Sequence, residues 1–184
     1  MAEHLCPVWV GYLLANPIRK LIQNPRKIVG PHIKEGMKVL DIGCAMGFFS
    51  LPVAEMVGPG GKVVCVDVQR KMISSLEKRA RNARLSDKIE TRLCPADSLG
   101  LGDITEEIDF AIAFAVVHEV PDAASLFSEV YGTIKRGGRF LVAEPWGHVS
   151  KDEFAATVST AEQAGFTIID RPQINRSRAV LLGK

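Results

Sequence analysis

The feature that most constrains the fold is a β-type run, Lys38–Ile42, that leads directly into a short segment bounded by two glycines, Gly43–Gly47. Helical segments alternate with six further β-type runs, at residues 62–67, 89–94, 108–117, 139–143, 166–170 and 178–182. This alternation predicts an α/β domain with a largely parallel sheet. Glycines between a first strand and a helix let backbone approach a ligand closely, at the sheet edge where such folds bind small molecules.

The early runs are apolar almost throughout, as expected of strands covered on both faces. The pattern therefore predicts a doubly wound, mostly parallel, seven-stranded sheet with helices on both faces, formed by residues 37–184. Residues 1–36 contain four prolines and are predicted to form one or two short helices laid against this domain.

Composition excludes several classes of protein. The chain has 184 residues, of which 47% are hydrophobic, and a net charge of only +2. The apolar stretches are shorter than the roughly 18 residues that span a bilayer, and four widely spaced cysteines form no CxxC pair. We therefore expect a cytoplasmic protein with no membrane span and no metal site. Residues 70–92 carry a net charge of +5, which we interpret as the solvated face of a helix, with a polyanion-binding patch as the alternative.

The glycine segment excludes two common nucleotide-binding motifs. Read from Gly43, the sequence GCAMGF fails the dinucleotide pattern G-x-G-x-x-G at two of its three glycines. The phosphate-binding pattern G-x-x-x-x-G-K-[ST] is absent, because Phe48 and Phe49 follow Gly47 where lysine and a hydroxyl residue should stand.

The segment Asp41–Gly47, with a second acid, Asp67, at the end of the next strand run, resembles the class I S-adenosylmethionine-dependent methyltransferases. The resemblance runs from Lys38 to Lys184 and is to the small-molecule type, near the quinone-biosynthesis-like branch. It implies a Rossmann-like sheet and S-adenosylmethionine as cofactor. The positions it implies for cofactor binding are Asp41, Gly43, Cys44, Ala45, Gly47, Asp67, Val68, Asp97 and Ser98.

In that family the glycine loop packs against the methionine moiety, the acid that Asp67 matches takes the ribose hydroxyls, and the acid that Asp97 matches meets the adenine amino group. Charge-assisted hydrogen bonds of this kind are among the strong ones. Ala45 departs from the usual middle glycine. Its extra methyl group is expected to weaken cofactor binding or to shift the loop.

The acceptor side is expected at the carboxyl ends of the fourth and fifth strands. His118 and Glu144 are the candidates for proton acceptor, and Trp146 for a wall of the acceptor pocket. The resemblance further implies that residues 1–36 form a lid, with Trp9 and Tyr12 contacting substrate. The Asn/Asp-Pro-Pro-aromatic motif of nucleic-acid amino-methyltransferases is absent at residues 117–119, which argues against a nucleic-acid partner.

We therefore predict methyl transfer from S-adenosylmethionine to a small-molecule acceptor by in-line displacement. Two alternatives stay open at this point: an RNA or protein methyltransferase that uses the basic faces, and a non-catalytic S-adenosylmethionine-binding protein, which the alanine in the loop makes conceivable. A homodimer is also left open.

Overall fold

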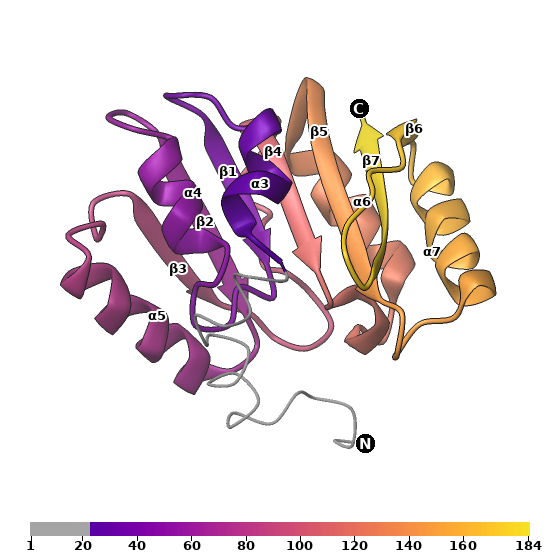
Figure 1. The fold of residues 1–184 in the computed structure, drawn as a ribbon, viewed down its shortest axis with the longest axis horizontal. Helices are drawn as coiled ribbons and strands as arrows, with labels where there is room; N and C mark the ends of the chain where they lie inside the picture. Colours follow the sequence, from indigo (N-terminus) through magenta and orange to yellow (C-terminus); the bar gives the residue numbers. More distant parts are fainter. Residues whose placement is uncertain (1–22) are drawn as a thin grey trace. The chain divides into compact units, whose positions relative to one another are not determined.

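The computed structural model describes residues 23–184. The chain divides into two compact units, Met1–Leu93 and Cys94–Lys184. The strand order is that of one seven-stranded mixed sheet, numbered along the chain as β3-β2-β1-β4-β5-β7-β6 (Figure 1). The predicted α/β class and strand number are confirmed.

The first unit is built on three parallel strands: β1 (Lys38–Ile42), β2 (Lys62–Asp67) and β3 (Ile89–Leu93). In register, Asp41 of β1 lies beside Cys65 of β2, and Asp67 lies beside Leu93 of β3. Every residue of β1 and β2 beyond the first lysine of each is buried, which explains their nearly continuous apolar sequences.

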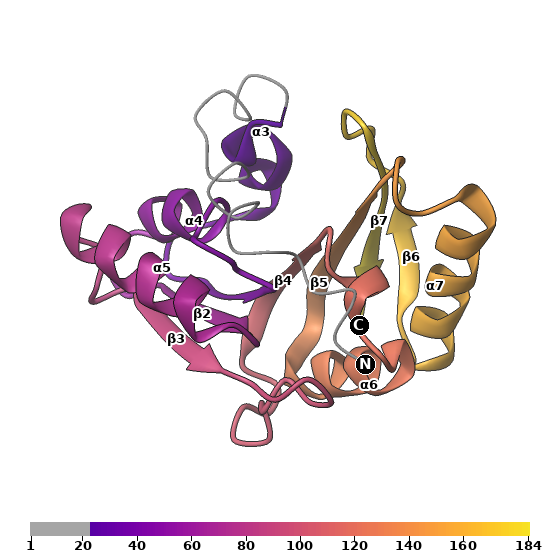
Figure 2. The ribbon, with the colours of Figure 1, turned by 90° about the horizontal axis from the view of Figure 1, so that it is seen from below.

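The helices of the first unit are α3 (Pro25–Val29), the 3₁₀ turn η1 (Gly30–His32), α4 (Ser50–Met56) and α5 (Arg70–Asn82). α5 buries Met72, Ile73, Leu76 and Ala80, which recur at helical spacing, and it packs on β2 and β3 (Figure 2). Short helices over residues 25–32 agree with the prediction for that part of the N-terminal segment.

The second unit contains two parallel strands, β4 (Ile108–Phe114) and β5 (Ile134–Pro145), and an antiparallel pair, β6 (Thr167–Asp170) and β7 (Ser177–Gly183), in which β7 also pairs with β5. Its helices are the 3₁₀ turn η2 (Val117–Glu119), α6 (Ala123–Thr133) and α7 (Lys151–Gln163). Phe127 of α6, Phe140 of β5 and Phe166 pack ring against ring in its core.

Two strand boundaries differ from the sequence prediction by three residues or more. β4 ends at Phe114, three residues early, because Ala115 takes a left-handed backbone (φ 59°) that breaks the extended run and leads into η2. β5 begins at Ile134, five residues early, because Ile134 already pairs with Ile108; the register then shifts, so that Phe110 pairs with Arg139 and the extra residues lie in β5. In the described part of the chain, no helix is both long and apolar enough to cross a membrane.

Candidate functional site

The loop after β1 is a strained backbone turn. Gly43, Ala45 and Gly47 all have positive φ, at 66°, 46° and 84°. Gly47 must be glycine for a second reason, because a Cβ there would collide with the side chain of Leu76 on α5. Ala45 carries a methyl group in the left-handed region, which costs an L-residue roughly 1–2 kcal/mol. The alanine that stands in place of the family's usual glycine is therefore held in a backbone conformation that alanine disfavours.

Asp67 ends β2 and is 8% exposed. Its Oδ2 accepts the Ala45 N–H at 2.9 Å and its Oδ1 accepts the Gln69 N–H at 2.8 Å. Burial raises the pKa of Asp67, and these two bonds oppose the rise. An ionised carboxylate has about four acceptor positions, so Asp67 can accept two more hydrogen bonds. It fits the hydroxyl donors of a ribose, which would stabilise its buried charge.

Asp41, one strand away, does not project into solvent. It is buried in β1 and accepts a hydrogen bond from Ser50 Oγ at 2.5 Å. Burial raises the pKa of Asp41 to about 7; the Ser50 bond opposes this and the nearby charge of Asp67 adds to it. Ser50, at the start of α4, was not predicted, because its side-chain contact spans nine residues and leaves no local pattern.

Cys44 and Val68 are two further positions of the predicted cofactor site. A hydrogen bond with the Cys65 thiol, together with burial, raises the pKa of the Cys44 thiol, so Cys44 stays protonated at neutral pH. Val68 is half-buried and follows Asp67 directly. Among the described residues, no three His, Cys, Asp or Glu side chains are grouped to hold a metal ion.

Asp97 and Ser98 lie in the loop that follows β3 and opens the second unit. Asp97 is exposed, and Ser98 Oγ accepts the N–H of Gly100 at 3.0 Å. The next residue, Leu99, donates its N–H to both carboxylate oxygens of Glu129 on α6, at 3.2 and 3.1 Å. Glu129 therefore anchors the Asp97 loop to α6, a role with no local sequence signal.

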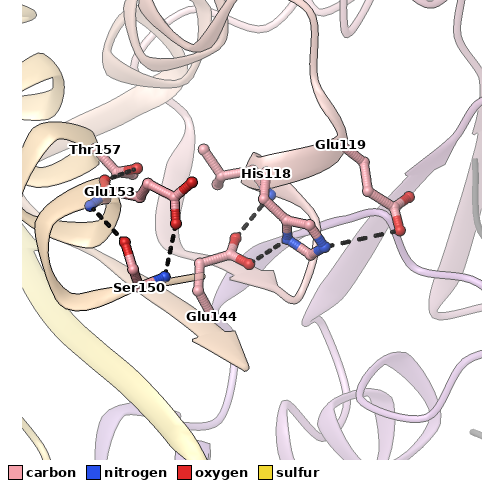
Figure 3. Close-up of polar contacts among 7 residues, drawn as sticks. His118, Glu119, Glu144, Ser150, Glu153 and Thr157 are labelled. Atoms are coloured by element: carbon pink, nitrogen blue, oxygen red, sulfur yellow. Dashed lines mark hydrogen bonds and ion pairs between the residues drawn. The ribbon is translucent and has the colours of Figure 1, made fainter. Parts of the chain in front are cut away.

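The structure brings His118 and Glu144 together (Figure 3). Glu144, near the end of β5, is 1% exposed. Its Oε2 lies 2.5 Å from His118 Nδ1, and its Oε1 accepts the Val117 N–H at 2.8 Å. The hydrogen bond to Glu144 raises the pKa of His118, although partial burial opposes the rise. Both carboxylate oxygens of Glu144 thus contact residues of η2, and Nε2, the other ring nitrogen of His118, faces away from Glu144.

Two neighbours complete this cluster. Oε1 of Glu119 lies 4.0 Å from His118 Nε2, and the ring of His148 stands edge-on to that of His118 with centroids 5.6 Å apart.

Trp146 is 58% exposed, so its indole is open to a ligand. α7 begins just beyond, at the Ser150 and Glu153 capping box. Trp9 and Tyr12, with the first part of the expected lid, lie outside the described residues.

The strand order β3-β2-β1-β4-β5-β7-β6 is that of a Rossmann-like fold. Residues 33–174 match the family described as "Methyltransferase domain", and the chain belongs to that family. A solved structure of a SAM-dependent methyltransferase from Aquifex aeolicus has the same fold, with a TM-score of 0.85 over 97% of this chain and 98% of that one, at 21% identity.

Similar proteins of known name have larger chains. A demethylmenaquinone methyltransferase of Lactobacillus johnsonii is 28% identical over 61% of this chain and 45% of its own length. An arsenite methyltransferase of Halobacterium salinarum is 33% identical over 66% of this chain and 30% of its own length. The chain spans less than half the length of these relatives.

Proposed function

We propose that this chain transfers the methyl group of S-adenosylmethionine to a small-molecule acceptor. When bound, the cofactor supplies a methyl group on a positively charged sulfur; direct attack by the acceptor on the methyl carbon breaks the carbon–sulfur bond and releases S-adenosylhomocysteine. The protein's task is then to hold the nucleoside and the acceptor in line and to take up a proton where the acceptor must lose one. Such positioning is worth roughly 7–11 kcal/mol in favourable cases. The family, the fold and the relatives' names support this reading.

The observation that carries the proposal is the Asp67 carboxylate. It stands at the carboxyl end of β2, is nearly buried, and fixes the glycine loop through Ala45 while keeping acceptor positions free. In the proposed complex Asp67 takes the ribose hydroxyls, the loop Gly43–Gly47 contacts the methionine moiety, and Asp97 with Ser98 contacts the adenine.

Calorimetric titration with S-adenosylmethionine and S-adenosylhomocysteine tests this assignment. We expect micromolar or tighter binding of both, and a loss of roughly 2–3 kcal/mol in Asp67→Ala because charged hydrogen bonds are removed. Asp87→Ala, which removes an exposed carboxylate after α5, is the matched control and should bind like the wild type. Equal affinity of Asp67→Ala and Asp87→Ala would show that Asp67 does not bind the ribose. An absence of binding in the wild type would show that S-adenosylmethionine is not the cofactor.

On the acceptor side we assign His118 as the general base and Glu144 as the residue that positions it. Glu144 holds the proton of the imidazole on Nδ1, which leaves the Nε2 lone pair to accept a proton from the acceptor. Glu144 cannot easily serve as the base itself, because both of its oxygens are already bonded to Val117 and His118. Trp146 supplies an exposed aromatic surface for the acceptor, and residues 1–36, with Trp9 and Tyr12, form a lid in this scheme.

The relatives' names favour a small-molecule acceptor, because demethylmenaquinone and arsenite are both small compared with RNA or protein. A panel of small phenols, amines, thiols and oxyanions, assayed for S-adenosylhomocysteine release, tests the acceptor class. Turnover of at least one member supports the proposal. Turnover confined to RNA or protein substrates would favour the first alternative, and tight cofactor binding with no transfer to any acceptor would favour a non-catalytic binding protein.

A further inference from the structure

The glycine loop is held from two directions. From β2, the Val66 carbonyl accepts the N–H groups of Gly43 and Cys44 at 2.9 and 3.1 Å, and the Asp67 carboxylate accepts that of Ala45. From α5, Nη1 of Arg79 donates to the Met46 carbonyl at 2.5 Å. The β2 contacts follow from the strand pairing next to the loop. The α5 contact instead brings in a side chain 33 residues away in sequence.

Arg79 differs from the other cations of its helix. Arg70, Lys78 and Arg81 are exposed, whereas Arg79 lies partly buried at the border of the apolar face. Desolvation lowers the pKa of Arg79, although an arginine still remains charged at neutral pH. Withdrawing a guanidinium from water is unfavourable unless it finds a strong acceptor. The acceptor here is a backbone carbonyl of the loop.

The bond to Arg79 fixes a particular peptide plane. The carbonyl of Met46 and the N–H of Gly47 belong to the same planar unit. The carbonyl is held by Arg79, and the N–H donates to the Cys44 carbonyl at 2.9 Å. With both of its polar groups bonded, this plane cannot rotate without breaking two hydrogen bonds. It lies between Ala45 and Gly47, two of the three residues of the loop with positive φ.

We propose that Arg79 is a positioning residue of the cofactor site, which locks the loop in its binding conformation before the ligand arrives. The inference rests on the proposed function, because it assumes that this loop receives the methionine moiety of S-adenosylmethionine. Preorganisation of this kind raises affinity by removing the free-energy cost of ordering the loop on binding. Arg79 then acts on the strength of cofactor binding and not on the methyl-transfer step.

Three variants of α5 test the proposal. Arg79→Met removes the donor but keeps most of the apolar stem, Arg79→Lys keeps the charge and one donor, and Arg81→Met removes an exposed cation from the same helix. We expect Arg79→Met to bind S-adenosylhomocysteine about tenfold more weakly, as loss of one charged hydrogen bond predicts. Arg79→Lys should be intermediate, and Arg81→Met should stay within twofold of the wild type. The turnover number at saturating cofactor should change little.

Amide hydrogen exchange of the ligand-free proteins supplies a second readout that needs no cofactor. Arg79→Met should speed exchange at Ala45 and Gly47 while leaving exchange in β1 and β2 as in Arg81→Met. Wild-type exchange in the loop together with wild-type affinity would overturn the proposal. If Arg79→Met does not fold, Arg79→Lys decides the matter by the same two measurements. Failure of the wild type to bind S-adenosylhomocysteine would overturn the proposed function itself, and the role of Arg79 with it.

Discussion

At the scale of single residues, Ala45 is a position where residue type and backbone conformation disagree. Its φ of 46° is a conformation that glycine adopts freely and alanine does not. Replacing it by glycine relieves roughly 1–2 kcal/mol of strain and gives back about 0.4–1 kcal/mol through the greater freedom of the unfolded chain. We therefore expect Ala45→Gly to raise the free energy of unfolding by about 0.5–1 kcal/mol, measured by urea denaturation.

The matched control for this substitution is Ala155→Gly, at an exposed position inside α7. The same chemical change there should lower the free energy of unfolding by roughly 0.5–1 kcal/mol, because glycine weakens a helix interior. Opposite signs for the two variants would confirm that strain at Ala45 is the cause. A destabilised Ala45→Gly would show that the methyl group makes contacts worth more than the strain it brings.

The titration of His118 should govern the pH dependence of activity. His118 acts as a base only when neutral, and the hydrogen bond to Glu144 raises its pKa. The rate should therefore rise with pH and reach half its maximum above the ordinary histidine pKa of about 6.5. In Glu144→Gln the amide carbonyl can keep the Val117 bond, but the amide N–H₂ then faces Nδ1 of His118 and favours the proton on Nε2, the wrong nitrogen for a base.

We accordingly expect Glu144→Gln to lower the maximal rate by about 100-fold or more and to move the half-maximal pH downward, because the negative partner of His118 is lost. The measurement is the turnover number from pH 5 to 9 at saturating substrates. Glu119→Gln, whose carboxylate lies 4.0 Å from Nε2, should shift the midpoint less. An unchanged midpoint in Glu144→Gln would exclude His118 as the titrating base.

At the scale of elements, the sequence predicts well what depends on neighbours along the chain. β1 and β2 are found at their predicted bounds, because burial on both faces of a strand leaves a continuous apolar run. The capping box that opens α7 is equally local. Its two bonds, between Ser150 and Glu153, span only three residues.

Contacts between elements explain what the sequence could not predict. The end of β4 depends on the left-handed backbone of Ala115, whose N–H bonds the Ala143 carbonyl of β5. The contacts of Arg79 with Met46 and of Glu129 with Leu99 join residues 33 and 30 positions apart. In the sequence each of these charged residues looks like one more member of a solvated helix face. Only the folded backbone distinguishes them from their exposed neighbours.

At the scale of the whole molecule, the division of roles follows the order of the chain. The unit that ends at Leu93 contains the glycine loop and Asp67, and the unit that begins at Cys94 contains the His118–Glu144 pair. The second part begins with a strongly acidic stretch, since residues 93–130 carry a net charge of −8, whereas residues 70–92 carry +5. The remaining residues bring the total to +2, so the small net charge conceals two neighbouring segments of opposite sign.

This charge pattern leads to a prediction that separates a small-molecule enzyme from one acting on RNA. If the exposed cations Arg70, Lys71, Lys78 and Arg81 of α5 are merely solvated, S-adenosylhomocysteine affinity and small-molecule turnover should change less than about threefold between 50 and 200 mM salt. RNA affinity that rests on six or more phosphate contacts would fall by about a thousandfold over that range. The double variant Lys78→Glu, Arg81→Glu should leave small-molecule turnover intact. Submicromolar RNA binding that disappears in this variant, and on which methyl transfer depends, would assign α5 to a nucleic-acid substrate instead.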